Sequence, residues 1–320
     1  MTIQRFIIFF FFVITSEAQA AGRLLNVEIP ASAEHPKGMV EVIADKQTYA
    51  VNYIPNIAYA NTENRQLTLS LLQPRQESTD PRPVIVFIQG GAWRNQNMHQ
   101  AIPQLIDFAR HGYVVASIEH RTSSEAVAPA QVQDIKSAIR FLRKNAEKYQ
   151  IDPNRLGIMG DSSGGHLATM VGVTDGVSDF DSQDNLAFSS AVKAVVDLYG
   201  PTDFLQMHKY PSRIDHNAED SPESLVVGGP IQDPKYRHLV DLYNPLTYIT
   251  KDKKLPPFLI IHGDIDPLVP FNQSVLLYGK LRDTGHTVTF QKVKGAGHGP
   301  GIWTQGIMDQ IQDFFDQYLM

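Results

Sequence analysis

The chain has 320 residues, of which 42% are hydrophobic and 19% are charged, a balance typical of a globular protein with a large core. Its formal net charge of −6 offers no basic surface of the kind that binds nucleic acid, so no nucleic-acid partner is predicted. The chain contains no cysteine, which excludes disulfides, a cysteine nucleophile and thiolate metal sites. Its stability must therefore come from the core, which a chain of this length can form.

The N-terminus has the pattern of a secretory signal peptide. Arg5 precedes an apolar run over residues 6–14, and a polar stretch then leads to Ala18-Gln19-Ala20, whose small-x-small form suits signal peptidase. The apolar run is too short to span a bilayer, which takes about 20 residues in a helix, so no stable membrane insertion is expected. We predict cleavage after Ala20 and a secreted or periplasmic protein. The alternative is that this run is a strand of the mature protein or a membrane anchor.

Hydrophobic patterning predicts the elements in chain order. Between residues of about 24 and 75, short alternating segments indicate half-buried antiparallel strands, most clearly at residues 66–72. Continuous β-branched and aromatic runs then indicate strands buried on both faces, at residues 84–88, 113–118, 156–159, 192–198 and 258–261. A more amphipathic strand is predicted at residues 287–293.

Helices are predicted between these strands, where apolar residues recur three or four apart, at residues 132–149, 274–282 and 307–318. Pro153 is expected to stop the first of them. Strands that alternate with helices predict an α/β fold with a mostly parallel central sheet, helices on both faces and an antiparallel N-terminal edge.

The domain organisation is predicted to be simple. No internal repeat or low-complexity linker divides the chain, so we expect a signal peptide at residues 1–20 and a single domain over residues 21–320. Residues of about 200–256 contain several prolines and no clear strand. We interpret this stretch as an insertion packed over the strand ends, near a substrate cleft.

A G-x-S-x-G motif follows the strand predicted at residues 156–159, where the chain reads Gly160-Asp161-Ser162-Ser163-Gly164 before an apolar helix. Open α/β sheets bind ligands at the carboxyl ends of their strands. Glycines permit the strained turn that presents a nucleophilic serine there, so Ser162 is the predicted nucleophile. Ser163 is the weaker candidate, because centring the motif on it puts Asp161 where a side chain is least tolerable.

A nucleophilic serine needs a histidine base and a carboxylate that orients the base. After a turn of this type, the chain order is Ser, then Asp or Glu, then His. His298 lies in a glycine-rich loop after the last strand and is the predicted base, whereas His286 precedes that strand and is interpreted as a surface turn residue. Asp266, after the strand at residues 258–261, is the predicted acid. The alternatives are Asp264, which we expect to stabilise the turn, Asp197 and Asp203.

Backbone N–H groups are expected to bind the oxyanion. One should belong to Ser163, directly after the nucleophile, and another to the loop Gln89-Gly90-Gly91-Ala92-Trp93, which follows the strand at residues 84–88. The glycines of this loop let its backbone approach a substrate closely. An ordinary tight turn is the alternative interpretation.

With these motifs, the sequence resembles the esterase and lipase branch of the α/β-hydrolases. It looks most like bacterial esterases that combine an H-G-G-x-W oxyanion loop with G-D-S-x-G-G-H, some of which act on acetylated or feruloylated plant polysaccharides. The resemblance spans residues of about 83–300. It implies a catalytic triad of Ser162, Asp266 and His298, with Gly91, Ala92 and Ser163 at the oxyanion hole.

The sequence departs from this family pattern at two positions. Gln89 stands where the family usually has histidine, and Ala92 replaces a frequent glycine. Both changes preserve the backbone donors, but they leave open how the loop is anchored. Arg121 matches a family arginine, which we interpret as structural support.

The resulting hypothesis makes residues 21–320 one α/β-hydrolase catalytic domain. We expect a serine carboxylic-ester hydrolase with an acyl-enzyme intermediate, acting on acetyl or feruloyl esters of plant polysaccharides or on other small esters. No H-E-x-x-H motif or Cys/His cluster is present, so no metal or cofactor is predicted, and the expected partner is the ester substrate. The alternatives are a serine exopeptidase or amidase of the same fold and a non-catalytic binding protein. Trp93 and Trp303 either flank the cleft or pack in the core.

Overall fold

The computed structural model describes residues 27–44, 50–76, 78–94 and 97–320, and the predicted signal peptide at residues 1–20 lies outside these ranges. The chain divides into two units, Met1–Lys46 and Gln47–Met320. In the first unit, residues 27–44 form no helix or strand, and their side chains are exposed. Among the described residues, the strands predicted from about residue 24 begin at Val51, in the second unit.

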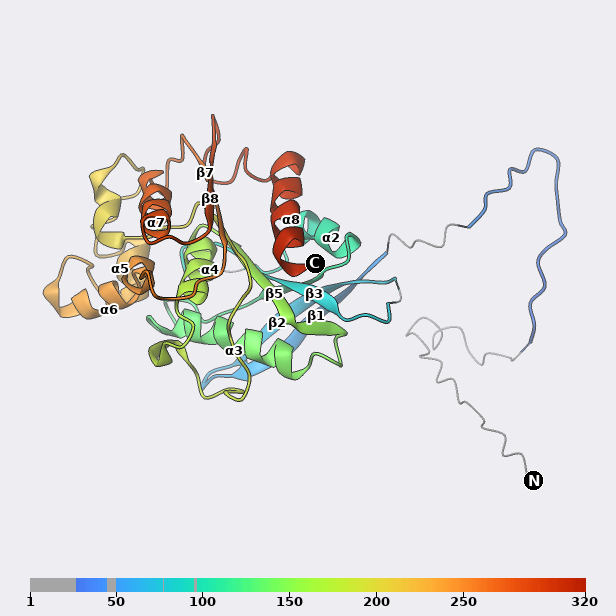
Figure 1. Cartoon of the computed structure of the whole chain (residues 1–320), viewed down its shortest axis with the longest axis horizontal. Coiled ribbons are helices and arrows are strands. Elements are labelled where there is room, and N and C mark those ends of the chain that lie inside the picture. Colours follow the sequence, from blue (N-terminus) through green and yellow to red (C-terminus); the bar gives the residue numbers. More distant parts are fainter. Residues whose placement is uncertain (1–26, 45–49, 77, 95–96) are drawn as a thin grey trace, which may run out of the picture. The chain divides into compact units, whose positions relative to one another are not determined.

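The second unit is built on an eight-stranded sheet in the order β1-β2-β4-β3-β5-β6-β7-β8 (Figure 1). β2 runs antiparallel to both β1 and β4, and the pairs from β4 through β3 and β5 to β8 are all parallel. The strands are β1 (Val51–Asn61), β2 (Gln66–Pro74), β3 (Arg82–Ile88), β4 (Val114–Ile118), β5 (Ile151–Asp161), β6 (Val195–Leu198), β7 (Phe258–Gly263) and β8 (Val288–Val293).

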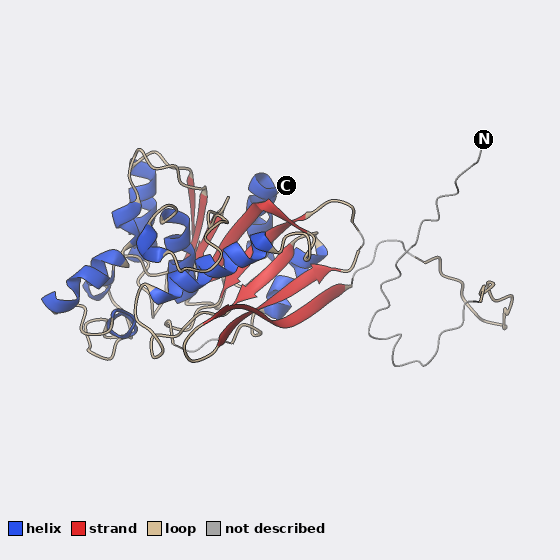
Figure 2. Cartoon of the chain, turned by 90° about the horizontal axis from the view of Figure 1, so that it is seen from below, coloured by secondary structure: helices blue, strands red, loops and turns tan. Residues whose placement is uncertain are grey.

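The central parallel strands are buried on both faces. In β3, Val84 and Val86 point into one hydrophobic cluster, while Ile85 and Phe87 point into another, because successive side chains of a strand face opposite sides. The first cluster includes buried side chains of α3 (Ala130–Lys144), α4 (Ser163–Val173) and α7 (Asn272–Asp283). The second includes those of α2 (Ile102–Arg110) and α8 (Gln305–Leu319). Figure 2 shows the helices in blue on either side of the red sheet, so the predicted fold class is confirmed.

One predicted boundary is wrong. α3 ends at Lys144, well before Pro153, and Pro153 lies inside β5. Basic side chains in the last turn of α3 suit the negative end of its dipole, and Asn145 caps the helix. Ile151 already pairs with Arg82, and the register shifts before the next pair. Such an irregularity lets a strand accommodate a proline.

The stretch between β6 and β7 contains short helices and no strand in the described chain. These are α5 (Pro222–Val227), α6 (Arg237–Leu242) and the 3-10 turns η2 (Phe204–Lys209), η3 (Pro234–Tyr236) and η4 (Pro245–Tyr248), whereas η1 (Ser178–Phe180) precedes β6. Among the described helices, none combines the length and apolar character needed to cross a membrane.

Candidate active site

The turn between β5 and α4 presents Ser162 in a strained backbone conformation, with φ 52° and ψ −124°. A Cβ atom at Gly160 would overlap the carbonyl oxygen of Gly164, and one at Gly164 would overlap the carbonyl oxygen of Ile88. The two glycines of the motif are therefore required by the close approach of the backbone. The N–H of Ser162 donates to the carbonyl oxygen of Leu198 at 2.8 Å, which ties the turn to β6.

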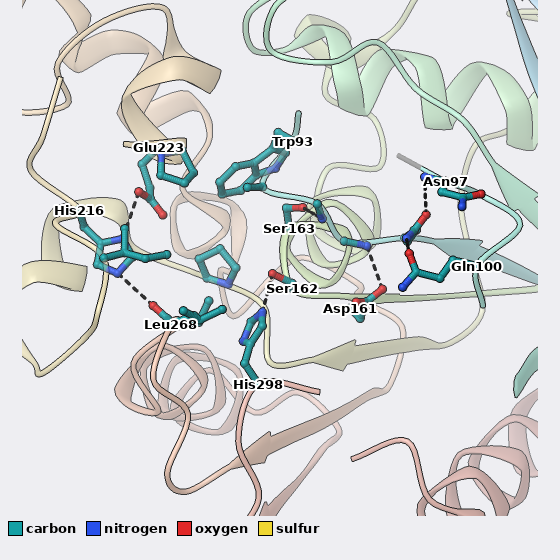
Figure 3. A pocket seen from close by; sticks show the side chains of 18 residues that line it. Trp93, Asn97, Gln100, Asp161, Ser162, Ser163, His216, Glu223, Leu268 and His298 are labelled. Atoms are coloured by element: carbon teal, nitrogen blue, oxygen red, sulfur yellow. Dashed lines mark hydrogen bonds and ion pairs between the residues drawn. The ribbon is translucent and has the colours of Figure 1, made fainter. Parts of the chain in front are cut away.

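The structure brings Ser162, His298 and Asp266 together (Figure 3). His298 Nε2 lies 2.9 Å from Ser162 Oγ, and His298 Nδ1 lies 2.7 Å from Asp266 Oδ2. Because an ionised carboxylate only accepts hydrogen bonds, Nδ1 is the donor and Nε2 is free to accept the serine proton. The other oxygen of Asp266, Oδ1, accepts the N–H groups of Leu268 and Val269 at 2.8 and 3.0 Å.

A second imidazole, which the sequence analysis missed, contacts the predicted acid. His262, near the end of β7, is fully buried, and its Nε2 lies 3.2 Å from Asp266 Oδ2 and 3.1 Å from the carbonyl oxygen of Val269. The carbonyl requires a proton on Nε2, so Nδ1 accepts from the Ser274 hydroxyl at 2.8 Å. Burial by itself would raise the pKa of Asp266, but hydrogen bonds from His262 and His298 outweigh it and hold that pKa well below its ordinary value.

The other candidate acids and the other candidate base form local contacts. Asp197, Asp203 and Asp264 each accept a backbone N–H group of a nearby turn, at 2.8, 3.1 and 2.6 Å respectively. The Gly295 N–H that Asp264 accepts lies in the loop that carries His298, so this hydrogen bond joins two loops. His286 Nε2 lies 2.9 Å from the carbonyl oxygen of Thr250. Ser163, the rival nucleophile, points its hydroxyl at the Gly91 N–H rather than at an imidazole.

The backbone N–H groups of Ala92 and Ser163 have no acceptor in the described part of the chain. The Ser163 N–H belongs to the first turn of α4, where N–H groups have no intrahelical acceptor and the helix dipole favours negative charge. The Gly91 N–H, by contrast, donates to Ser163 Oγ at 3.1 Å. Of the three residues implied for the oxyanion hole, Ala92 and Ser163 therefore offer free donors, and the Gly91 donor is engaged.

Gln89 anchors the loop that carries Ala92. Its Oε1 accepts the N–H of Asn97 at 2.8 Å, and its Nε2 donates to Gln100 Oε1 at 3.0 Å. The Gly90 N–H also donates to Asp161 Oδ1 at 2.9 Å, which joins the loop to the nucleophile turn. The glutamine thus provides hydrogen bonds that hold the loop in place of the family histidine.

A pocket of about 520 Å³ opens onto Ser162 and His298. In Figure 3, Asn97 and Gln100 lie on one side of Ser162, and His216 and Glu223 lie on the other. The pocket is also lined by Pro201, Ile214, Pro222, Leu268 and Val269. Several of these residues belong to the stretch between β6 and β7, which therefore lines the pocket.

Three further residues singled out in the sequence are also in place. Trp93 is 2% exposed and packs edge-on against His166 and Phe204, while part of it lines the pocket. Trp303 Nε1 donates to the Tyr199 hydroxyl at 2.8 Å. Trp303 is half-buried, packs edge-on against Phe87 and lines a further pocket with His298, so each tryptophan both packs and borders a pocket. Arg121 Nε and Nη2 donate to both carboxylate oxygens of Asp134, which agrees with its interpretation as structural support. No group of three or more His, Asp or Glu side chains in the described ranges could hold a metal ion.

These features define the α/β-hydrolase class: the sheet is eight-stranded and mostly parallel, a G-x-S-x-G turn follows β5, a carboxylate follows β7, and a histidine follows β8. Within this class, the chain belongs to the BD-FAE family, an esterase family whose model matches residues 69–281.

Individual relatives agree with this family membership. Esterase LipC of Mycobacterium tuberculosis is 30% identical over 72% of this chain and 56% of its own length. Among solved structures, the truncated form of a carbohydrate esterase from gut microbiota is 36% identical, covers 85% of this chain and 98% of its own, and superposes with a TM-score of 0.74. A bifunctional GH43-CE protein of Bacteroides eggerthii is also 36% identical, with a TM-score of 0.74 over 83% of this chain and 38% of its own. The chain spans about half the length of the curated relatives that it matches.

Proposed function

We propose that this protein is a serine carboxylic-ester hydrolase that acts through an acyl-enzyme intermediate. The observation that carries the proposal is the continuous hydrogen-bonded path from Ser162 Oγ through His298 to Asp266 at the wall of a pocket. The esterase relatives support the same reaction class.

The chemistry follows from the positions of these groups. Ser162 Oγ attacks the ester carbonyl carbon while its proton moves to His298 Nε2, and Asp266 stabilises the imidazolium that forms. The carbonyl oxygen becomes an oxyanion that accepts from the Ala92 and Ser163 N–H groups. Collapse breaks the bond to the alcohol, which leaves with the proton from Nε2. Water then repeats the sequence on the acyl-enzyme and releases the acid, which restores the Ser162 hydroxyl.

The test combines turnover with covalent labelling. Ser162→Ala should abolish hydrolysis of p-nitrophenyl acetate and labelling by a fluorophosphonate probe, with an unchanged circular dichroism spectrum. Ser124→Ala is the matched control, because it removes a serine hydroxyl that is exposed and does not line the pocket, so activity and labelling should persist. Full activity of Ser162→Ala would refute the assignment. An unlabelled, inactive wild-type protein would favour a non-catalytic binding protein, and faster turnover of aminoacyl amides than of esters would favour an exopeptidase or amidase.

For the substrate, we propose acetyl or feruloyl esters of plant polysaccharides, or other small esters, met outside the cytoplasm. One relative with a solved structure is described as a carbohydrate esterase and another as a bifunctional GH43-CE protein, which supports this choice. Export rests on the sequence of residues 1–20. N-terminal sequencing of the protein recovered from a secreting host should begin at Ala21, and a retained Met1 would contradict export by cleavage.

A further inference from the structure

Two ionisable side chains line the same pocket as Ser162 and take no part in the proposed triad. His216 and Glu223 are 1% and 3% exposed, and both come from the stretch between β6 and β7. His216 Nε2 lies 3.1 Å from the carbonyl oxygen of Leu268, which can only accept, so this nitrogen carries a proton. The imidazole is therefore fixed with Nδ1 facing Glu223.

The contact between the two side chains leaves hydrogen-bonding capacity unused. His216 Nδ1 lies 3.1 Å from Glu223 Oε2, but the approach is not aligned as a hydrogen bond, and both atoms are enclosed without a hydrogen-bond partner in the described chain. Trp93 Nε1, on the same pocket, is also enclosed without a partner in that part of the chain. Figure 3 shows Glu223 between His216 and Trp93.

A buried carboxylate with so little compensation is costly. An unsatisfied buried polar group costs about 1–3 kcal/mol, and an ionised one costs more. Buried polar groups in folded proteins are otherwise almost always paired, so an exception at a pocket wall points to a ligand. The surrounding wall is apolar, with Ile214 and Pro222 beside the pair. A few polar groups at the end of an apolar wall are typical of sites that fix the orientation of a small ligand.

We propose that Glu223 and His216, with Trp93, bind a hydroxyl group of the substrate, an inference that rests on the proposed esterase function. The hydroxyl proton would be donated to the Glu223 carboxylate, and the hydroxyl oxygen would accept from the Trp93 N–H. A hydroxyl both donates and accepts, which matches these three groups. An ammonium group can only donate, and a carboxylate can only accept. The hydroxyl belongs either to the acyl group, as a phenol, or to the alcohol, as a sugar.

The experiment compares esters with and without that hydroxyl. The phenolic pair is methyl 4-coumarate and methyl cinnamate, and the sugar pair is a methyl xyloside monoacetate and tetrahydropyranyl acetate. Glu223→Gln removes the charge and keeps the size, and Glu223→Met removes the polar end. We expect kcat/KM for the hydroxylated member of one pair to fall about 10-fold in Glu223→Gln and about 100-fold in Glu223→Met, as for loss of a hydrogen bond to a charged group. Turnover of the hydroxyl-free member should stay within threefold. The pair that responds identifies the source of the hydroxyl.

Glu219→Gln is the matched control, because Glu219 lies on the same stretch, is exposed and does not line the pocket. Equal losses on both members of each pair, or no loss on either, would overturn the inference. If the Glu223 variants fail to fold, the wild-type protein still tests the inference. Equal kcat/KM values for the two members of both pairs would then overturn the inference. A wild-type protein that neither hydrolyses p-nitrophenyl acetate nor takes a fluorophosphonate label would instead refute the proposed function.

Discussion

Asp266→Asn is the substitution that most directly tests the geometry of the proposed triad. The carboxylate accepts from the imidazoles with Oδ2 and from the N–H groups of Leu268 and Val269 with Oδ1. An amide supplies only one acceptor oxygen, so its NH₂ must face one of these donor sets. The backbone N–H groups cannot move their protons, but His298 can, so the amide oxygen should face the backbone and the NH₂ should face His298.

In that orientation, His298 carries its proton on Nε2 and cannot accept the proton of Ser162. Loss of the correct tautomer lowers kcat by about 10,000-fold in serine enzymes of this type, which corresponds to about 5 kcal/mol of activation free energy. We therefore expect kcat for p-nitrophenyl acetate to fall about 1,000- to 10,000-fold at pH 8, with the secondary structure intact by circular dichroism.

Asp264→Asn is the control for this prediction. Asp264 accepts one N–H group, that of Gly295, and an amide oxygen can replace it there, so activity should stay within threefold. An Asp266→Asn enzyme with more than a tenth of wild-type kcat would refute the role assigned to this carboxylate. Equal losses in the two variants would show that the loop, rather than the tautomer, limits activity.

Two further predictions concern stability. Gly164→Ala places a Cβ against the carbonyl oxygen of Ile88, so the free energy of unfolding measured in urea should fall by about 3 kcal/mol. Gly279→Ala, at an open position of α7, is the control and should be neutral or stabilising. Similar losses in both variants would contradict the packing argument. Burial lowers the pKa of His166 to about 4, so between about pH 6.5 and pH 4 the unfolded chain binds a proton that the folded protein excludes, and stability falls as the pH falls. His166→Gln should remove about 3 kcal/mol of this acid destabilisation. The measurement is the difference between the free energies of unfolding in urea at pH 7.5 and at pH 4. A variant that loses as much stability as the wild type over this range would contradict the prediction.

The buried parallel strands were predictable because both of their faces lie in the core, which leaves a continuous apolar run such as residues 84–88. Their ends were less predictable, because they depend on pairing with distant strands. β5 begins at Ile151 since that residue pairs with Arg82, and nothing near Ile151 in the chain indicates this. The shortening of β6 to Val195–Leu198 likewise follows its partners in the sheet.

The candidate nucleophile, acid and base were accessible from the sequence because the motif around Ser162 is local and the order of the other two is constrained. His262 was missed, although its place near a strand end, one i,i+4 step before the candidate acid, was a usable signal. Glu223 and His216 carried no such signal. Their stretch has several prolines and no clear strand, and their meeting in the pocket depends on how its short helices and turns fold.

The stretch that supplies His216 and Glu223 runs without interruption between β6 and β7, whereas Ser162, Asp266 and His298 follow β5, β7 and β8. Under the proposals above, part of substrate recognition is encoded apart from the reacting groups, although Trp93 and the loop after β3 also line the pocket. Recombination that replaces the stretch between β6 and β7 would exchange one wall of the pocket and leave the proposed reacting groups on their original strands. Such modularity gives a directed-evolution library a compact target, and it offers a physical route by which enzymes of this family diversify.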